Sequence, residues 1–275
     1  MDAHQFIRTE TDFVPKVAII LGSGLGGIAD RIDRVLTIPF ADIPGFAAST
    51  AGGHRGELIL GNLQGERVVA MAGRLHRYEG HSRAQVALPV ATMSALGATT
   101  LIVSNAAGGL NPDFSVGDLV VIRDHIDWLG GGPDGHVTSP APVGVFRQDE
   151  VYCPVLGDAA VRSGLRHGFV VHHGTYLATL GPNYETRAEY RMMRRLGADL
   201  AGMSTVPEAI TAARHGMKVL AVSMVSNVAN PDAPQVADHA EVLAAGQLAG
   251  SKLERIVRDV LGNVAATDSP GTRGD

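Results

Sequence analysis

A group of side chains suited to holding an oxyanion lies in residues 73–81, which read Gly-Arg-Leu-His-Arg-Tyr-Glu-Gly-His. On an extended backbone Arg74, His76 and Tyr78 project to one side, so a guanidinium, an imidazole and a phenol converge. The guanidinium fork matches phosphate geometry, a protonated imidazole adds a donor, and Glu79 can orient or charge His76. The segment therefore indicates an anion site, with a solvated charged loop as the alternative.

A glycine-rich loop, Gly-Ser-Gly-Leu-Gly-Gly, occupies residues 22–27 directly after a run that is typical of a strand. Three of its glycines have the spacing of a dinucleotide-binding fingerprint, in which amides at a helix N-terminus reach a pyrophosphate. The helix that follows can run only over about residues 25–32, which is shorter than a dinucleotide-binding unit requires. A small-anion site, with Ser23 adding a hydroxyl donor, is favoured over a dinucleotide site or a plain tight turn.

A run of small residues, Ser-Asn-Ala-Ala-Gly-Gly-Leu-Asn-Pro, covers residues 104–112 after another strand-like segment. Small residues at the C-terminal end of a strand leave room for a ligand in open α/β sheets, and their amides can donate to an anion. A simple Gly-rich turn is the alternative, and it is favoured when the run is taken alone.

Side chains suited to a flat heterocycle lie where predicted strands end or helices begin. The segments are residues 181–186, 202–208 and 226–227. Tyr184 can stack on a ring, Glu185 can accept from ring N–H groups, and Asn227 offers both a donor and an acceptor. Residues 204–208 also have the composition of an ordinary helix start, so capping alone would explain them.

Apolar, β-branched runs alternate along the chain with segments of amphipathic helical spacing. Strands are predicted at residues 17–21, 58–60, 68–70, 100–104, 119–122, 174–179 and 219–225. Helices are predicted at residues 84–96, 188–196, 207–215 and 238–260. A turn at residues 60–66 adds an antiparallel element. The alternation predicts an α/β fold with a largely parallel or mixed sheet.

The composition is that of a globular protein with a sizeable core. The chain has 275 residues, of which 45% are hydrophobic and 19% charged, so we expect a single domain. Its net charge of −5 provides no global positive field for nucleic acid or an anionic membrane, so an anion must be bound locally. The single cysteine, Cys153, excludes an intramolecular disulfide and fits a cytoplasmic location.

Three segments are expected to be mobile or exposed. Residues 1–14 and 265–275 are predicted to be flexible, and the Gly- and Pro-rich residues 130–149 form a candidate lid.

The N-terminal residues have no apolar core of a secretory signal, and the chain has no apolar run of the ~20 residues that a membrane span needs.

Six sequence motifs, in their order along the chain, resemble those of the trimeric purine nucleoside phosphorylases. They are Gly22-Ser23-Gly24-Leu25-Gly26, Gly53-His54-Arg55-Gly56, Gly73-Arg74-Leu75-His76-Arg77-Tyr78-Glu79-Gly80, Ser104-Asn105-Ala106-Ala107-Gly108, Gly181-Pro182-Asn183-Tyr184-Glu185-Thr186 and Gly202-Met203-Ser204. The resemblance runs from about Val17 to the C-terminal helix. It implies a phosphorylase/hydrolase-like fold, with a mixed, distorted central sheet surrounded by helices, and a homotrimer. It also implies no metal and no organic cofactor, with inorganic phosphate as co-substrate.

The resemblance implies a role for each matching residue. Phosphate would be held by Ser23, His54, Arg74, His76, the backbone amide of Ala106, and Ser204. The ribose would be held by Tyr78, Met203 and His239, and the base by Tyr184, Glu185 and Asn227. Tyr184 stands where many relatives have Phe, and Cys153 stands where a neighbouring subunit lends an aromatic residue.

The implied activity is reversible phosphorolysis of 6-oxopurine nucleosides such as inosine, guanosine and xanthosine, in purine salvage. His76, Glu185 and Asn227 would be catalytic, with Asn227 donating to the leaving purine. A 5′-methylthioadenosine phosphorylase is the nearest alternative, disfavoured by Asn227 and the polar His239. A dinucleotide-dependent oxidoreductase and a non-catalytic nucleoside-binding protein are more distant alternatives.

Overall fold

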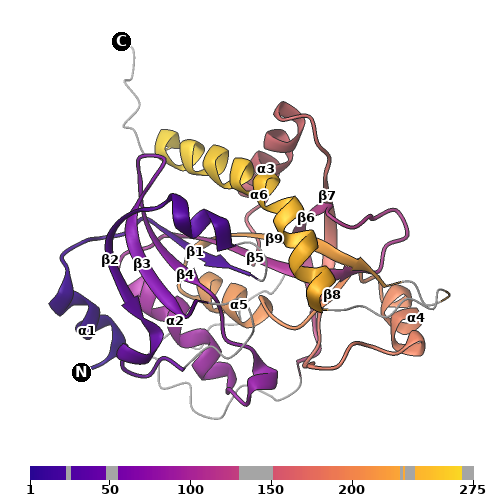
Figure 1. The fold of residues 1–275 in the computed structure, drawn as a ribbon, viewed down its shortest axis with the longest axis horizontal. Coiled ribbons are helices and arrows are strands. Elements are labelled where there is room, and N and C mark those ends of the chain that lie inside the picture. The colour runs from indigo at the N-terminus through magenta and orange to yellow at the C-terminus, as the bar shows by residue number, and fades with distance from the viewer. Residues whose placement is uncertain (23–25, 48–54, 130–150, 230–231, 233–238, 268–275) are drawn as a thin grey trace.

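The computed structural model describes residues 1–22, 26–47, 55–129, 151–229, 232 and 239–267. The candidate lid at residues 130–149 therefore lies outside the described residues. Figure 1 shows the described chain as one body of strands flanked by helices. This arrangement confirms the predicted single-domain α/β fold.

Nine strands in the described part form one mixed sheet, in the order β2-β3-β4-β1-β5-β8-β7-β6-β9. Their bounds are β1 Val17–Leu21, β2 Asp33–Pro39, β3 Glu57–Leu63, β4 Glu66–Ala72, β5 Thr100–Gly109, β6 Leu119–Asp127, β7 Val171–Ala178, β8 Leu200–Gly202 and β9 Lys218–Val228. Strand β9 also pairs in parallel with β5, so the five strands from β5 to β9 close on themselves. This closure is the distortion that the sequence resemblance implied.

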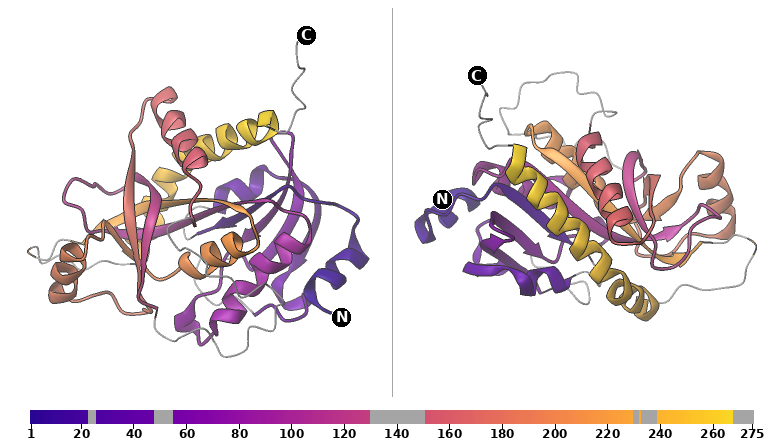
Figure 2. Two further views of the ribbon diagram at one scale, coloured as in Figure 1. Left: turned by 180° about the vertical axis from the view of Figure 1, so that it is seen from behind. Right: turned by 90° about the horizontal axis from the view of Figure 1, so that it is seen from above.

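Helices cover both faces of the sheet (Figure 2), and two large apolar clusters and one smaller cluster lie within the described residues. Their bounds are α1 Ala3–Glu10, α2 Arg83–Ala95, α3 Pro154–Arg166, α4 Arg187–Arg195, α5 Val206–Arg214 and α6 His239–Thr267, with short 3₁₀ helices at Gly26–Arg31, Phe40–Asp42 and Arg77–Glu79. Buried residues of α1, α2 and α5 belong to one large cluster, and those of α3 and α6 to the other large cluster. Because helices cover both faces of the sheet, β1 is buried along its whole length, and its sequence is a continuous apolar run.

Each strand and helix predicted from the sequence overlaps an observed one, and the β3–β4 hairpin confirms the predicted antiparallel element. Gln64 and Gly65 both have positive φ, as a type I′ hairpin turn requires. The sequence analysis missed α1, α3, β2 and β8, and it favoured a Gly-rich turn for a run that includes residues 105–109. Those residues instead continue β5, because β9 and β8 pair with them.

The chain ends differ from the sequence-based expectation. Residues 1–14 were expected to be flexible, but α1 has a capping box between Asp2 and Gln5 and buries Ile7 completely. Helix α6 was expected to end before Gly262, but it continues to Thr267. Buried residues of α1 and α6 belong to the two large apolar clusters, and this packing outweighs the local end signals.

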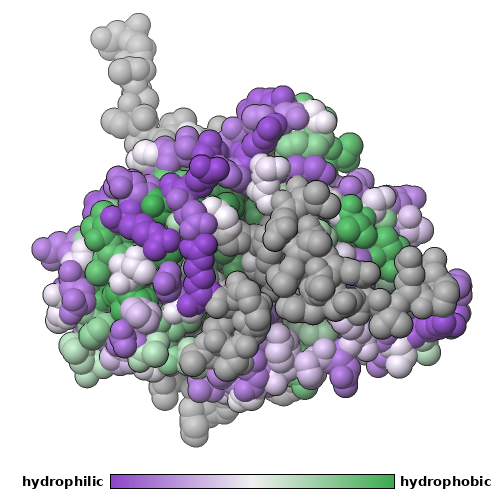
Figure 3. Space-filling model, in the orientation of Figure 1, coloured by the Kyte–Doolittle hydropathy of each residue, from purple (hydrophilic) through white to green (hydrophobic). Residues whose placement is uncertain are grey.

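The surface is mixed in character. On the face in Figure 3, hydrophilic residues predominate and smaller hydrophobic patches lie between them. None of the helices in the described residues is both long enough and apolar enough to cross a lipid bilayer.

Candidate active site

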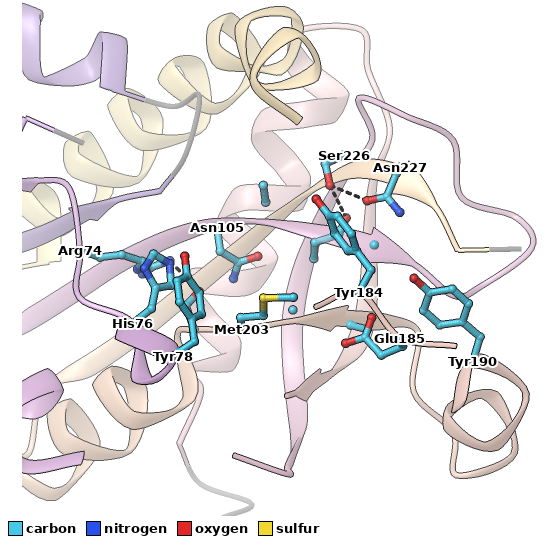
Figure 4. A pocket seen from close by; sticks show the side chains of 16 residues that line it. Arg74, His76, Tyr78, Asn105, Tyr184, Glu185, Tyr190, Met203, Ser226 and Asn227 are labelled. Atoms are coloured by element: carbon cyan, nitrogen blue, oxygen red, sulfur yellow. Dashed lines mark hydrogen bonds between the residues drawn. The ribbon is translucent and has the colours of Figure 1, made fainter. Parts of the chain in front are cut away.

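A pocket opens where β5, β8 and β9 end, and it brings most of the predicted site residues together (Figure 4). The predicted residues that line it are Arg74, His76, Tyr78, Ala106, Tyr184, Glu185, Met203, Ser204 and Asn227. Arg74, His76 and Tyr78 gather at one end, with Tyr184, Glu185 and Asn227 at the other and Met203 between them. Ser23 and His54 lie outside the described residues, as does the side chain of His239 at the start of α6.

The sheet order explains why the polar end forms. Strands β4, β1 and β5 are parallel neighbours, so the segments after β4 and β1 meet the C-terminal half of β5. Gly22 follows β1, and its N–H donates to the Ser104 hydroxyl at 3.3 Å. A side chain on Gly22 would lie 2.6 Å from the Ser104 carbonyl oxygen, so glycine is required for this close approach. The glycine loop therefore begins against the strand that carries Ala106.

Arg74 is fixed by contacts on two sides. Its side chain is 2% exposed, and Nη1 donates to the Ser104 carbonyl and to the Ser204 hydroxyl, both at 2.9 Å. Its Nε donates to Oε1 of Glu208 at 3.2 Å. The predicted partners Arg74 and Ser204 thus share one buried polar cluster.

His76 is oriented by Glu79, as the sequence predicted. Oε1 of Glu79 lies 3.0 Å from Nδ1 of His76 and also accepts the His76 backbone N–H at 2.9 Å. A carboxylate on Nδ1 favours the tautomer with its proton there, so Nε2 is an acceptor in the neutral ring and a donor only in the protonated ring. The prediction of an extended face was wrong, since Arg77–Glu79 forms a 3₁₀ turn. That turn stacks Tyr78 on His76, with ring centroids 4.7 Å apart.

The other end of the pocket holds an aromatic side chain, a carboxylate and a carboxamide. Tyr184 is 43% exposed, so its ring is open to a ligand. The Ser226 hydroxyl donates to Oδ1 of Asn227 at 2.9 Å, which fixes the carboxamide and leaves its NH₂ group to donate to a ligand. The register of β5 and β9 shifts between Ala107 and Gly108, and Gly108 then faces Asn227. Such bulges redirect side chains next to active sites.

Several residues of the site received no role in the sequence analysis, although four of them lie in the segments 104–112, 202–208 and 226–227 that it selected. They are Asn105, Thr179, Tyr190, Thr205, Glu208 and Ser226. Thr179 follows β7 and Tyr190 lies on α4, and neither differs in the sequence from an ordinary residue of a strand end or a helix. Burial, together with the nearby Glu185 and Tyr184, raises the pKa of Tyr190 to about 12. No local sequence signal separates these residues from structural ones.

Comparisons with known proteins agree with this geometry. Residues 16–262 match the family model described as the phosphorylase superfamily. Purine nucleoside phosphorylase 1 of Geobacillus stearothermophilus is 44% identical over 264 residues, which cover 96% of each chain. The purine nucleoside phosphorylase of Bos taurus is 38% identical and covers 98% of this chain and 96% of its own. This chain belongs to the purine nucleoside phosphorylases.

Solved structures of purine nucleoside phosphorylases share the fold. The Schistosoma mansoni enzyme in complex with inosine has a TM-score of 0.86 at 38% identity, covering 94% of each chain. The same enzyme in complex with adenosine gives a TM-score of 0.86 at 39% identity, with the same coverage. Family membership favours phosphorolysis over the oxidoreductase alternative, and the short 3₁₀ helix Gly26–Arg31 after the glycine loop agrees.

Proposed function

We propose that this protein catalyses the reversible phosphorolysis of purine nucleosides. Phosphate attacks C1′ of the ribose, the bond from C1′ to N9 of the base breaks, and free purine and α-ribose 1-phosphate form. One observation carries the proposal. A single pocket holds a buried Arg, His and Ser cluster at one end and an aromatic, carboxylate and carboxamide set at the other, in a chain of this family.

The polar end supplies the donors for phosphate. Arg74 offers a fixed guanidinium and Ser204 a hydroxyl, and His76 can donate from Nε2 in its protonated imidazolium form. Cleavage of the glycosidic bond develops positive charge on the ribose. A phosphate dianion beside C1′ stabilises that charge before it becomes the nucleophile, so no covalent enzyme intermediate is needed.

The base end supports the leaving purine. Electron density accumulates at N7 as the bond breaks, and the Asn227 amide can donate there. Glu185 can accept the N1 proton of a 6-oxopurine, and Tyr184 can stack on the ring. Interactions that strengthen as charge develops lower the barrier rather than merely tightening binding.

We propose that 6-oxopurine nucleosides are preferred over adenosine in turnover. Adenine presents an unprotonated N1 to Glu185, so a hydrogen bond is replaced by repulsion. Sites built around a buried hydrogen bond reject analogues that lack it by as much as ~10⁴–10⁵. Because a relative was crystallised with adenosine, binding and turnover must be measured separately.

The decisive experiment measures purine release from five nucleosides, each with and without phosphate. The substrates are inosine, guanosine, xanthosine, adenosine and 5′-methylthioadenosine. Release of hypoxanthine from inosine that requires phosphate supports the proposal, and release without phosphate contradicts it. Faster turnover of 5′-methylthioadenosine than of inosine would show that the protein is a 5′-methylthioadenosine phosphorylase instead.

We also propose a homotrimer in the cytoplasm that needs no metal or organic cofactor. Its resemblance to the trimeric relatives supports the trimer, and its single Cys153 supports a reducing location. In a trimer, Cys153 at the start of α3 would take the place of the aromatic residue lent by a neighbour. Sedimentation velocity tests the trimer, and full activity after dialysis against EDTA tests the absence of a metal requirement.

A further inference from the structure

A buried ion pair lies behind the polar end of the pocket. Arg74 and Glu208 are 2% and 3% exposed, and Nε of Arg74 lies 3.2 Å from Oε1 of Glu208. The two residues are 134 positions apart in the sequence. Glu208 stands in the first turn of α5 and is not among the residues that line the pocket. The proposed mechanism gives it no part.

The contacts fix the plane of the guanidinium. Glu208 accepts from Nε, while Nη1 donates to the carbonyl of Ser104 on β5 and to the hydroxyl of Ser204 before α5. A planar guanidinium that is hydrogen-bonded to two separate parts of the chain has little freedom to rotate. Removal of the Nε acceptor would release one of these two sides.

The turn that carries Ser204 is itself held in an unusual conformation. Thr205 has a φ of 72°, a left-handed conformation that is strained for a β-branched residue. Its hydroxyl accepts from Nδ2 of Asn105 at 2.8 Å and lies 3.2 Å from the Ser204 hydroxyl. Strained backbone persists where surrounding contacts hold it, and it gathers at functional sites. The network therefore ties the α5 end of the ion pair to β5, beside Ala106.

The charge of Glu208 acts against a bound anion. Arg74 is the one Lys or Arg side chain among the described residues that line the pocket, and Glu208 cancels its charge within the protein. Oε2 of Glu208 makes no hydrogen bond in the described part of the chain, so the carboxylate is committed chiefly to Arg74. A buried carboxylate next to the phosphate site lowers the local positive potential.

We propose that Glu208 is a positioning residue that fixes the Arg74 guanidinium for phosphate and, through its counter-charge, limits how tightly phosphate is held. This inference rests on the proposed phosphorolysis. It predicts that position and charge can be separated by substitution, because the two roles change phosphate affinity in opposite directions.

Two variants of Glu208 make that separation. Glu208→Gln keeps an oxygen that can accept from Nε and removes the charge, so the KM for phosphate should fall about tenfold. Glu208→Asp keeps the charge but withdraws the carboxylate by one methylene, so the KM for phosphate should rise. The KM for inosine should change little in either variant, because Glu208 does not line the base end of the pocket.

Controls distinguish this role from a structural one. Glu254→Gln removes a carboxylate that also pairs with an arginine, Arg258 at 2.7 Å, but on the surface of α6, and it should leave both KM values unchanged. In an Arg74→Met background, Glu208→Asp should no longer raise the KM for phosphate, because the positioning role acts through the guanidinium. Thermal unfolding of every variant shows which of them are folded.

The outcomes separate the two proposals. Wild-type protein that shows no phosphate-dependent release of base contradicts the proposed function itself. An active wild type in which Glu208→Gln raises the KM for phosphate, or changes both KM values equally, overturns the role of Glu208. If Glu208→Gln does not fold, Glu208→Asp decides alone, and an unchanged KM for phosphate overturns the inference.

Discussion

The hydroxyl of Thr179 donates a hydrogen bond of 2.8 Å to Oε1 of Glu185, and it also lies 3.4 Å from the Gly202 carbonyl oxygen. Thr179 follows β7, and Gly202 ends β8. The carboxylate proposed to recognise the base is therefore held in place by the ends of two adjacent strands. The carboxylate also has a side-chain hydrogen bond with Tyr190 of α4.

Removal of the Thr179 hydroxyl should weaken recognition of the base. Thr179→Val keeps the shape of the side chain but removes one hydrogen bond that orients Glu185, so kcat/KM for inosine should fall about tenfold. The KM for phosphate should stay unchanged. Steady-state kinetics with each substrate varied in turn would check this. Thr211→Val removes a hydroxyl that bonds the Pro207 carbonyl on α5, and it serves as the matched control.

Tyr190 should make the protein less stable at high pH. Burial, with the neighbouring Glu185 and Tyr184, raises its pKa to about 12, above the value of about 10 for an unfolded tyrosine. The unfolded chain therefore releases this proton first, and stability should be fully present below pH 10 and decline between pH 10 and 12. Urea unfolding over this range should show a smaller decline for Tyr190→Phe. An equal decline in both proteins would contradict the shift.

Arg74 should control phosphate rather than nucleoside. Arg74→Ala removes the guanidinium that is fixed at the polar end, so the KM for phosphate should rise much more than the KM for inosine. Arg74→Lys should restore phosphate binding only in part, because an ammonium cannot reproduce a bidentate fork. Weakened binding of inosine alone would show that the anion site is misplaced.

Asn227 should support the leaving base. Asn227→Ala should lower kcat by roughly a hundredfold or more, as loss of one preorganised donor does elsewhere. Asn227→Asp should narrow the ratio of kcat/KM for inosine to that for adenosine, because an acid suits a 6-amino group. The two nucleosides are compared at saturating phosphate. An unchanged kcat in the alanine variant would remove Asn227 from the mechanism.

The N-terminal helix should contribute to stability. Ile7 is fully buried on α1, so Ile7→Ala should lower the free energy of unfolding by roughly 2–5 kcal/mol while leaving phosphorolysis intact. Val14→Ala, at a side chain that is 45% exposed, should cost much less. Urea denaturation followed by circular dichroism measures both. An Ile7→Ala variant as stable as the wild type would support the original expectation of a flexible end.

The sequence alone determined the kinds of chemistry and the elements that carry them. Arg74, His76 and Glu79 lie close together in the chain, so their types and spacing were enough to predict an anion site and the contact from Glu79 to His76. Tyr184, Glu185 and Asn227 were found in the same way, as side chains placed where predicted strands and helices meet. Local pattern is informative here because neighbours in the chain stay neighbours in the fold.

Only the tertiary structure decided which distant residues complete the site. Residues 105–109 are small and glycine-rich, and they look like a turn until β9 and β8 supply hydrogen-bonding partners for their backbone. From the sequence, Glu208 is an ordinary residue in the first turn of a helix. The tertiary fold places it against Arg74, which is 134 positions away in the sequence. Strand pairing and buried charge depend on what the rest of the chain brings to a position, and no local propensity records that.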